Sequence, residues 1–203
     1  MDNAISILDD TTWEEYLDKL CSHGVPLDDW PMSGLTDIEM DEMTAAVDLR
    51  LPDEARVLWR WHDGVPEDGR ANPLGGFKGR FLSLCEAVNG HRQSRKVVLD
   101  VAEDDPVEDD PDMHYRPSWL PLLGPQHPLV IDCSVARDQP TPLRMVDLAD
   151  PEEPPVEARS LGEVVQLWSN ALDRGLWKWD AAKQGWEVDL SSLPPMQRAS
   201  PLL

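Results

Sequence analysis

The high content of proline and glycine constrains this fold more than any other feature of its sequence. The 203 residues include 19 prolines and 12 glycines, which interrupt helices and strands throughout. The elements must therefore be short, mixed in type and joined by many loops. Hydrophobic residues make up 41% of the chain, which at this length supplies one core. We expect a single, loop-rich domain over residues 1–190, followed by a flexible tail over 191–203.

Capping patterns predict four helices. Thr11 and Thr12 each precede a glutamate by three positions, which predicts a capping box for a helix that ends at His23-Gly24. Thr36-x-x-Glu39 opens a second helix, expected to stop near Arg50, and Pro52 suits the first turn of a third that ends at Gly64. Ser160-x-x-Glu163 begins the most regular helix, whose apolar face includes Trp168.

Strands are expected between these helices and after them. Residues 77–84 alternate enough to predict a strand, and residues 85–96 predict a helix that is interrupted at Asn89-Gly90. Residues 127–135 and 141–149 predict two strands that pair antiparallel. Residues 176–189 predict a hairpin.

The charge is strongly acidic. Lysine and arginine number 18 against 39 aspartates and glutamates, which gives 18 − 39 = −21. Nucleic-acid binders and basic membrane-surface modules need clustered cations, so both classes are disfavoured and a basic protein partner is favoured. Residues 1–70 hold 5 basic and 18 acidic side chains (5 − 18 = −13), residues 71–99 hold 5 and 1 (+4), and residues 100–113 hold 0 and 8 (−8).

The stretch 100–113 is expected to be an acidic, proline-containing loop. Three interpretations of it stay open: a solvated loop, a contact surface for a basic partner, or a weak calcium site. An EF-hand is excluded, because the required glycine and the final bidentate glutamate are missing. We expect no metal site and no cofactor.

Sequence patterns of common catalytic sites are missing. The chain has no phosphate-binding loop, no dinucleotide-binding glycine pattern, no H-E-x-x-H and no G-x-S-x-G. Cys21, Cys85 and Cys133 contain no C-x-x-C pair, which favours a reducing compartment and, without a signal peptide or spanning segment, the cytoplasm. A hydrolase built on Asp132, Cys133 and a loop histidine remains the enzymatic alternative.

An ordered set of short patterns resembles the SUKH superfamily, which includes a fungal regulator of cell-wall assembly and many bacterial immunity proteins. The set begins with Gly34-Leu35 before a capped helix, Leu51-Pro52 before the next, and the run Trp59 to Gly64 at its end. Trp119-Leu120-Pro121, Leu129 to Asp132 and the late helix with Trp168 follow in the same order. The resemblance spans about residues 10–190.

The resemblance implies an α+β domain, with helices packed around a mixed, mainly antiparallel sheet, and binding instead of catalysis. It implies an immunity protein that neutralises a toxin domain, or else a regulatory or scaffold module with another intracellular partner. Trp61 cannot share a helix face with Trp59, so one of the two rings must point to a second surface or to a neighbouring element. The candidate partner-binding residues are Trp61, His62, Asp63, Glu108, Asp109, Asp110, Trp119 and Asp132.

Overall fold

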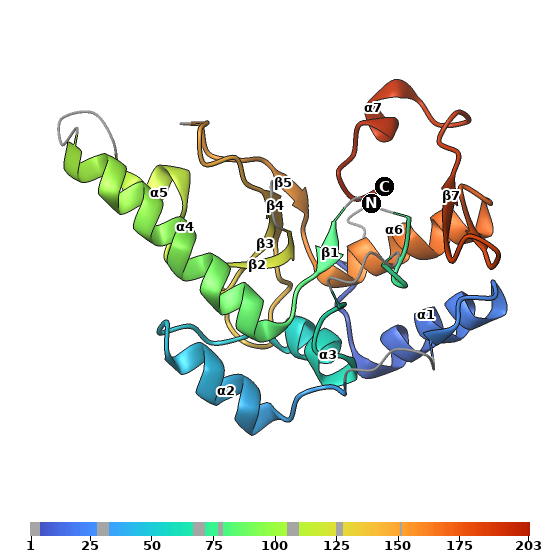
Figure 1. Cartoon of the computed structure of the whole chain (residues 1–203), viewed down its shortest axis with the longest axis horizontal. Coiled ribbons are helices and arrows are strands. Elements are labelled where there is room, and N and C mark those ends of the chain that lie inside the picture. The colour runs from blue at the N-terminus through green and yellow to red at the C-terminus, as the bar shows by residue number, and fades with distance from the viewer. Residues whose placement is uncertain are drawn as a thin grey trace.

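The computed structural model describes residues 5–27, 33–66, 72–76, 79–104, 110–124, 128–150 and 152–203. They form an α+β fold, as expected (Figure 1). The helices are α1 (Asp10–Ser22), α2 (Asp37–Ala45), α3 (Asp53–Trp61), α4 (Leu84–Asp104), α5 (Pro111–His114), α6 (Leu161–Asp173) and α7 (Pro195–Arg198). The strands are β1 (Arg80–Phe81), β2 (Trp119–Gly124), β3 (Leu129–Asp132), β4 (Leu143–Met145), β5 (Val156–Ala158), β6 (Trp177–Asp180) and β7 (Gly185–Val188).

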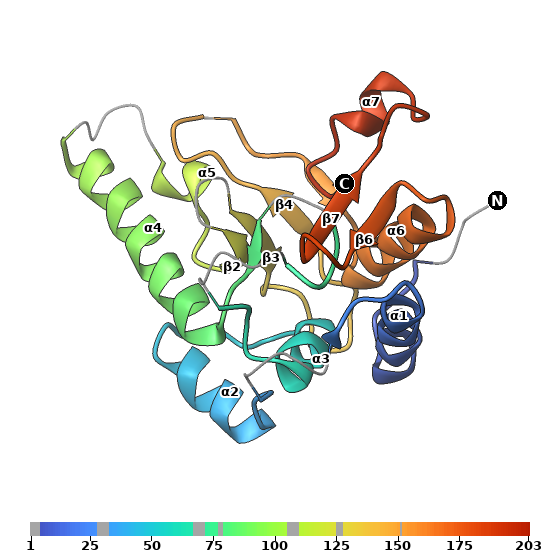
Figure 2. The same cartoon turned by 45° about the vertical axis from the view of Figure 1, so that its right-hand side comes forward.

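The larger sheet has the order β1-β2-β3-β4-β5, and each neighbouring pair is antiparallel. The predicted pairing of the two segments around β3 and β4 is confirmed, with Ile131 opposite Leu143. The predicted hairpin is also confirmed as β6 and β7, where Trp179 lies opposite Trp186. The hairpin forms a separate two-stranded sheet on the side of the molecule where α6 lies (Figure 2).

Helix α4 is a single helix of 21 residues, so the interruption predicted at Asn89-Gly90 is wrong. The helix runs along β2, and a Cβ at Gly90 would lie 3.5 Å from the Pro121 side chain, so a small residue suits this contact. Burial of Leu84, Ala87 and Val88 against the sheet outweighs the roughly 1 kcal/mol that a helical glycine costs. The same helix takes in residues 100–104, so the first part of the expected acidic loop is helical.

Two of the three capping predictions are confirmed. Thr36 and Glu39 form the capping box of α2, and Ser160 Oγ accepts a 3.0 Å hydrogen bond from Glu163 N at α6. The prediction for α1 is wrong, because Asp9 is the N-cap and its carboxylate accepts from Thr12 N at 2.7 Å. A charged acceptor at this position satisfies the orphan amide and also complements the helix dipole. Helix α2 ends at Ala45, earlier than Arg50.

The main core lies between the sheet and helices α1, α3 and α6, of which α1 and α6 pack side by side (Figures 1 and 2). Trp59 is fully buried there and donates from Nε1 to Leu82 O at 3.0 Å. Glu54 is buried beside this core. Its carboxylate accepts backbone hydrogen bonds from Leu8 (2.7 Å), Thr141 (2.6 Å) and Gly162 (3.0 Å), so it joins three distant segments.

The C-terminal segment is packed, in contrast to the flexible tail expected over 191–203. Leu193 and Leu202 are buried in the main core. Trp168 on α6 donates from Nε1 to Leu202 O at 3.0 Å. The buried indole of Trp168 needs a hydrogen-bond acceptor, and the carbonyl of Leu202 in this late segment supplies one. The domain therefore extends beyond residue 190.

Candidate functional site

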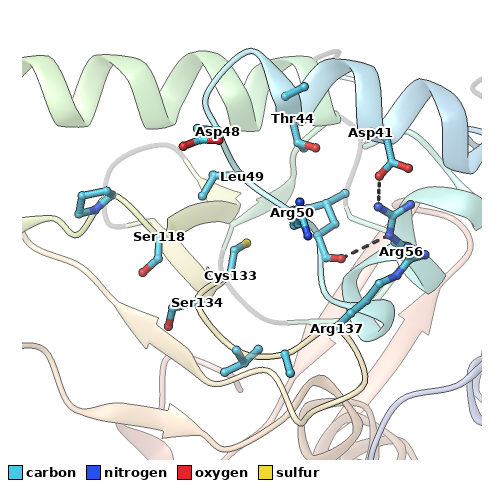
Figure 3. Close-up of a pocket in the computed structure, with 15 residues that line it drawn as sticks. Asp41, Thr44, Asp48, Leu49, Arg50, Arg56, Ser118, Cys133, Ser134 and Arg137 are labelled. Carbon is cyan, nitrogen blue, oxygen red and sulfur yellow. Dashed lines mark hydrogen bonds and ion pairs between the residues drawn. The ribbon is translucent and has the colours of Figure 1, made fainter.

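A pocket of about 900 Å³ lies between the end of α2, the connection to α3 and the loops that flank β2 and β3 (Figure 3). This volume is within the range of small-ligand sites. The lining comes from three parts of the chain that are far apart in sequence, within residues 41–56, 117–118 and 133–137. Its residues are Asp41, Thr44, Ala45, Asp48, Leu49, Arg50, Leu51, Arg56, Pro117, Ser118, Cys133, Ser134, Val135, Ala136 and Arg137.

The end of α2 places Asp48 at this pocket. Leu49 N donates to Thr44 O (3.1 Å) and Asp48 N to Ala45 O (3.2 Å), and these bonds close the helix with Asp48 at a φ of +55°. This is the left-handed position that glycine or asparagine usually occupies after a helix. The Asp48 side chain makes no hydrogen bond or ion pair within the described residues.

Arginines lie together on the other side of the pocket (Figure 3). The Arg56 side chain is 2% exposed, pairs with Asp37 (3.3 Å) and Asp41, and donates from Nε to Leu51 O at 3.3 Å. Arg137 Nε pairs with Asp53 at 2.5 Å. These two cations are thus matched by carboxylates.

Arg50 is exposed and, within the described residues, has no ion-pair partner. The pocket therefore holds one uncompensated carboxylate, that of Asp48, and one uncompensated guanidinium, that of Arg50. No sequence motif marks either residue.

Cys133 lies at the floor of the pocket, directly after β3, and its backbone N donates to Ser118 O at 2.8 Å. Burial raises the pKa of its thiol well above the usual range, so the thiol stays uncharged. Next to it, burial raises the pKa of Asp132, but hydrogen bonds from Ser134 and Ser118 outweigh this effect and hold that pKa below its ordinary value. The Cys133 thiol is therefore uncharged, whereas the neighbouring Asp132 carboxylate, which does not line the pocket, stays ionised.

Three predicted site residues, Trp61, His62 and Asp63, lie together at the end of α3. Trp61 is half-buried against Trp13, with ring centroids 5.5 Å apart. Of the two tryptophans, Trp59 is therefore the one buried in the main core, and Trp61 packs on the neighbouring helix α1. His62 is buried, with Nδ1 2.5 Å from Gly64 O. Asp63 Oδ1 accepts from Leu84 N at 2.7 Å, so it fixes the start of α4. Burial raises the pKa of Asp63.

The other predicted site residues do not join this group. Trp119 is fully buried, so its side chain does not reach the surface of the folded chain. Its carbonyl accepts from His91 Nδ1 (2.8 Å) and Tyr115 Oη (2.9 Å). Asp132 on β3 lies opposite Trp119 on β2 in the strand register and is also buried. Asp110 is exposed and caps α5 through Asp112 N. Glu108 and Asp109 lie outside the described residues.

The pocket residues could not be recognised from the sequence as a group, because they come from three distant parts of the chain. The available signal was Asp48 itself, a charged residue at the expected end of a helix. Within the described residues, no group of three or more histidine, cysteine or carboxylate side chains could hold a metal ion. Nor does any described helix have the length and apolarity to cross a membrane.

Comparison with known proteins gives no match: no family model fits the sequence, and no curated protein matches it.

Proposed function

We propose that this chain is a non-enzymatic, cytoplasmic binding protein of the immunity type, which neutralises a basic toxin domain of a bacterial polymorphic toxin system. The observation that carries the proposal is the net charge of −21, together with the exposure of acidic side chains on α2. Helix α2 buries only Met40 and Thr44 of its nine residues and carries no basic residue. Its outward carboxylates are those of Asp37, Glu39, Asp41 and Glu42.

A toxin that cleaves nucleic acid must bind a polyanion, so its active site is basic. An acidic protein surface can occupy the same site by imitating that polyanion. Opposite charges also speed the encounter and disfavour partners of like charge. The resemblance to SUKH proteins, many of which are immunity proteins, supports the same function.

The chemistry of Cys133 weighs against the hydrolase alternative. A cysteine nucleophile acts as the thiolate, which a nearby histidine or other cation usually stabilises. Burial raises the pKa of the Cys133 thiol, and no histidine of the described chain hydrogen-bonds to it. Its environment is that of an inert, buried thiol.

Co-expression tests the proposal directly. The reading frames beside the gene are searched for a large protein with a C-terminal toxin domain, and that domain is expressed with and without this chain. We expect growth to be restored only when both are present. Purified toxin domain that neither binds the chain nor loses activity in its presence would refute the proposal.

Association kinetics provide a second measurement on the same pair. The association rate should fall steeply as the Debye length shortens from about 10 Å at 0.1 M salt to about 3 Å at 1 M, while dissociation changes less. Replacing Glu108, Asp109 and Asp110 by their amides should flatten this dependence. An unchanged rate in that variant at low salt would assign the capture to other carboxylates, such as those of α2.

A further inference from the structure

The pocket at the end of α2 has an unusual charge balance. Arg56 and Arg137 are neutralised by Asp37, Asp41 and Asp53, so their charges are satisfied within the chain. The Asp48 carboxylate is not. It lies across the pocket from the arginines, as Figure 3 shows, and no cation of the described residues pairs with it.

Asp48 also destabilises the helix that it ends. A positive φ is less favourable for aspartate than for glycine or asparagine, and a negative charge opposes the negative end of the helix dipole. Asparagine would relieve both costs while keeping the same shape. Asp48 is exposed at the edge of the cavity and has no partner within the described residues, so its carboxylate is free to pair with a ligand.

The rest of the wall near Asp48 suits a side chain with an apolar stem. Leu49 and Cys133 present uncharged surface, and Ser118 and Ser134 offer hydroxyl oxygens as acceptors. The Cys133 thiol is nine-tenths buried, faces the cavity in Figure 3 and makes no hydrogen bond within the described residues. Lysine and arginine combine such a stem with a cationic head.

We propose that this pocket receives a lysine or arginine side chain of a protein partner, with Asp48 as its counter-ion. The inference rests on the proposed function and names where the basic partner is anchored. The negative field of the whole chain, to which the exposed Glu42 of α2 contributes, favours a cation here over an anion. Arg50, at the same pocket, opposes the cation and thereby limits its affinity.

Hexalysine is a suitable probe, because it supplies the cation without requiring the natural partner. Its dissociation constant is measured at about 0.1 M ionic strength, where screening beyond about 10 Å suppresses the general attraction to the acidic chain. Four proteins are compared: the unchanged chain, Asp48→Asn, Arg50→Gln and Glu152→Gln. Glu152 is exposed in the β4–β5 connection, at the opposite end of the sheet, so it is a control for loss of one charge.

We expect Asp48→Asn to weaken hexalysine binding about five- to tenfold, Glu152→Gln less than about twofold, and Arg50→Gln to strengthen it at least about twofold. Backbone amide shifts on titration should concentrate at residues 44–51 and 133–137. Equal effects of Asp48→Asn and Glu152→Gln would overturn the inference.

Tighter binding of hexaglutamate that is lost in Arg50→Gln would also overturn it, in favour of an anion pocket. Because no toxin is used, failure here would leave the proposed function standing. Conversely, a toxin that is not neutralised would refute the proposed function, and the hexalysine titration would still decide whether the pocket binds a cation.

Discussion

The buried carboxylate of Glu54 accepts a hydrogen bond from the backbone N–H of Gly162, a residue 108 positions later in the chain. The same oxygen accepts from Leu8 N, and the second oxygen accepts from Thr141 N. One side chain therefore supplies the hydrogen-bond acceptor for three buried amides, each of which donates to this carboxylate and not to a backbone carbonyl.

Glu54→Ala should lower the free energy of unfolding by at least about 3 kcal/mol, because each buried amide that loses its acceptor costs about 1 to 3 kcal/mol. Glu54→Gln should cost less, since one oxygen remains. Urea unfolding measures both, with the exposed Glu42→Ala as a control expected within about 0.5 kcal/mol of the unchanged chain. Equal stability of Glu54→Ala and Glu42→Ala would contradict this role.

Trp168→Ala should cost about 3 to 5 kcal/mol, because the ring is buried and donates to Leu202 O. Trp168→Phe keeps most of the apolar contact and loses the hydrogen bond, so a smaller loss is expected. Thermal and urea unfolding test the order of the three proteins. A cost below about 1 kcal/mol for the alanine variant would place this face of α6 in solvent.

Asp48→Asn should raise the free energy of unfolding by about 0.5 to 1 kcal/mol, because asparagine tolerates a positive φ and removes the charge from the helix C-terminus. Asp48→Gly should stabilise for the same two reasons. Asp48→Ala is the informative contrast, since it removes the charge but keeps a side chain that disfavours this backbone. Urea midpoints that rank alanine above asparagine would contradict the explanation.

The stability of Asp63→Asn should depend on pH in a defined direction. Burial raises the pKa of Asp63 in the folded chain, so its contribution is fully present below the unfolded pKa and is lost as pH rises through the folded value. The amide keeps an acceptor for Leu84 N without a charge. Asp63→Asn should therefore gain stability relative to the unchanged chain as pH rises from about 3.5 to neutrality.

Asp132→Asn is the control of opposite sign. The pKa of Asp132 is lowered, so its contribution is present above the unfolded pKa and is lost as pH falls through the folded value. This variant should lose stability relative to the unchanged chain as pH rises toward about 4, above which the difference levels off. Parallel pH profiles for the two variants would contradict both assignments.

Local signals in the sequence predicted the elements that depend on local contacts. The cap at Ser160, the capping box at Thr36 and the β6–β7 hairpin were all predicted, because each is formed by residues close in sequence. The continuity of α4 through Gly90 was not predicted, since it depends on packing against Pro121 in a strand about 30 positions later. Propensity alone favoured a break there.

The candidate site was largely hidden for the same reason. Trp61, His62 and Asp63 were recognised as a group because they are adjacent in sequence. Asp48, Arg50 and Arg137 meet only after the β3–β4 connection folds back onto α3, where Asp53 N donates to Arg137 O at 2.8 Å. No spacing rule links positions brought together by such a contact.

The contact between Trp168 and Leu202 has a consequence for how the chain can be synthesised and handled. A ribosome that has made α6 has not yet made the segment that covers its indole, so the core cannot close until residue 202 has emerged. Nascent chains and fragments that stop earlier expose a large apolar ring, which is a site for chaperone binding or aggregation. Removing the last few residues should therefore lower the yield of folded protein, even though none of the proposed binding residues lies there.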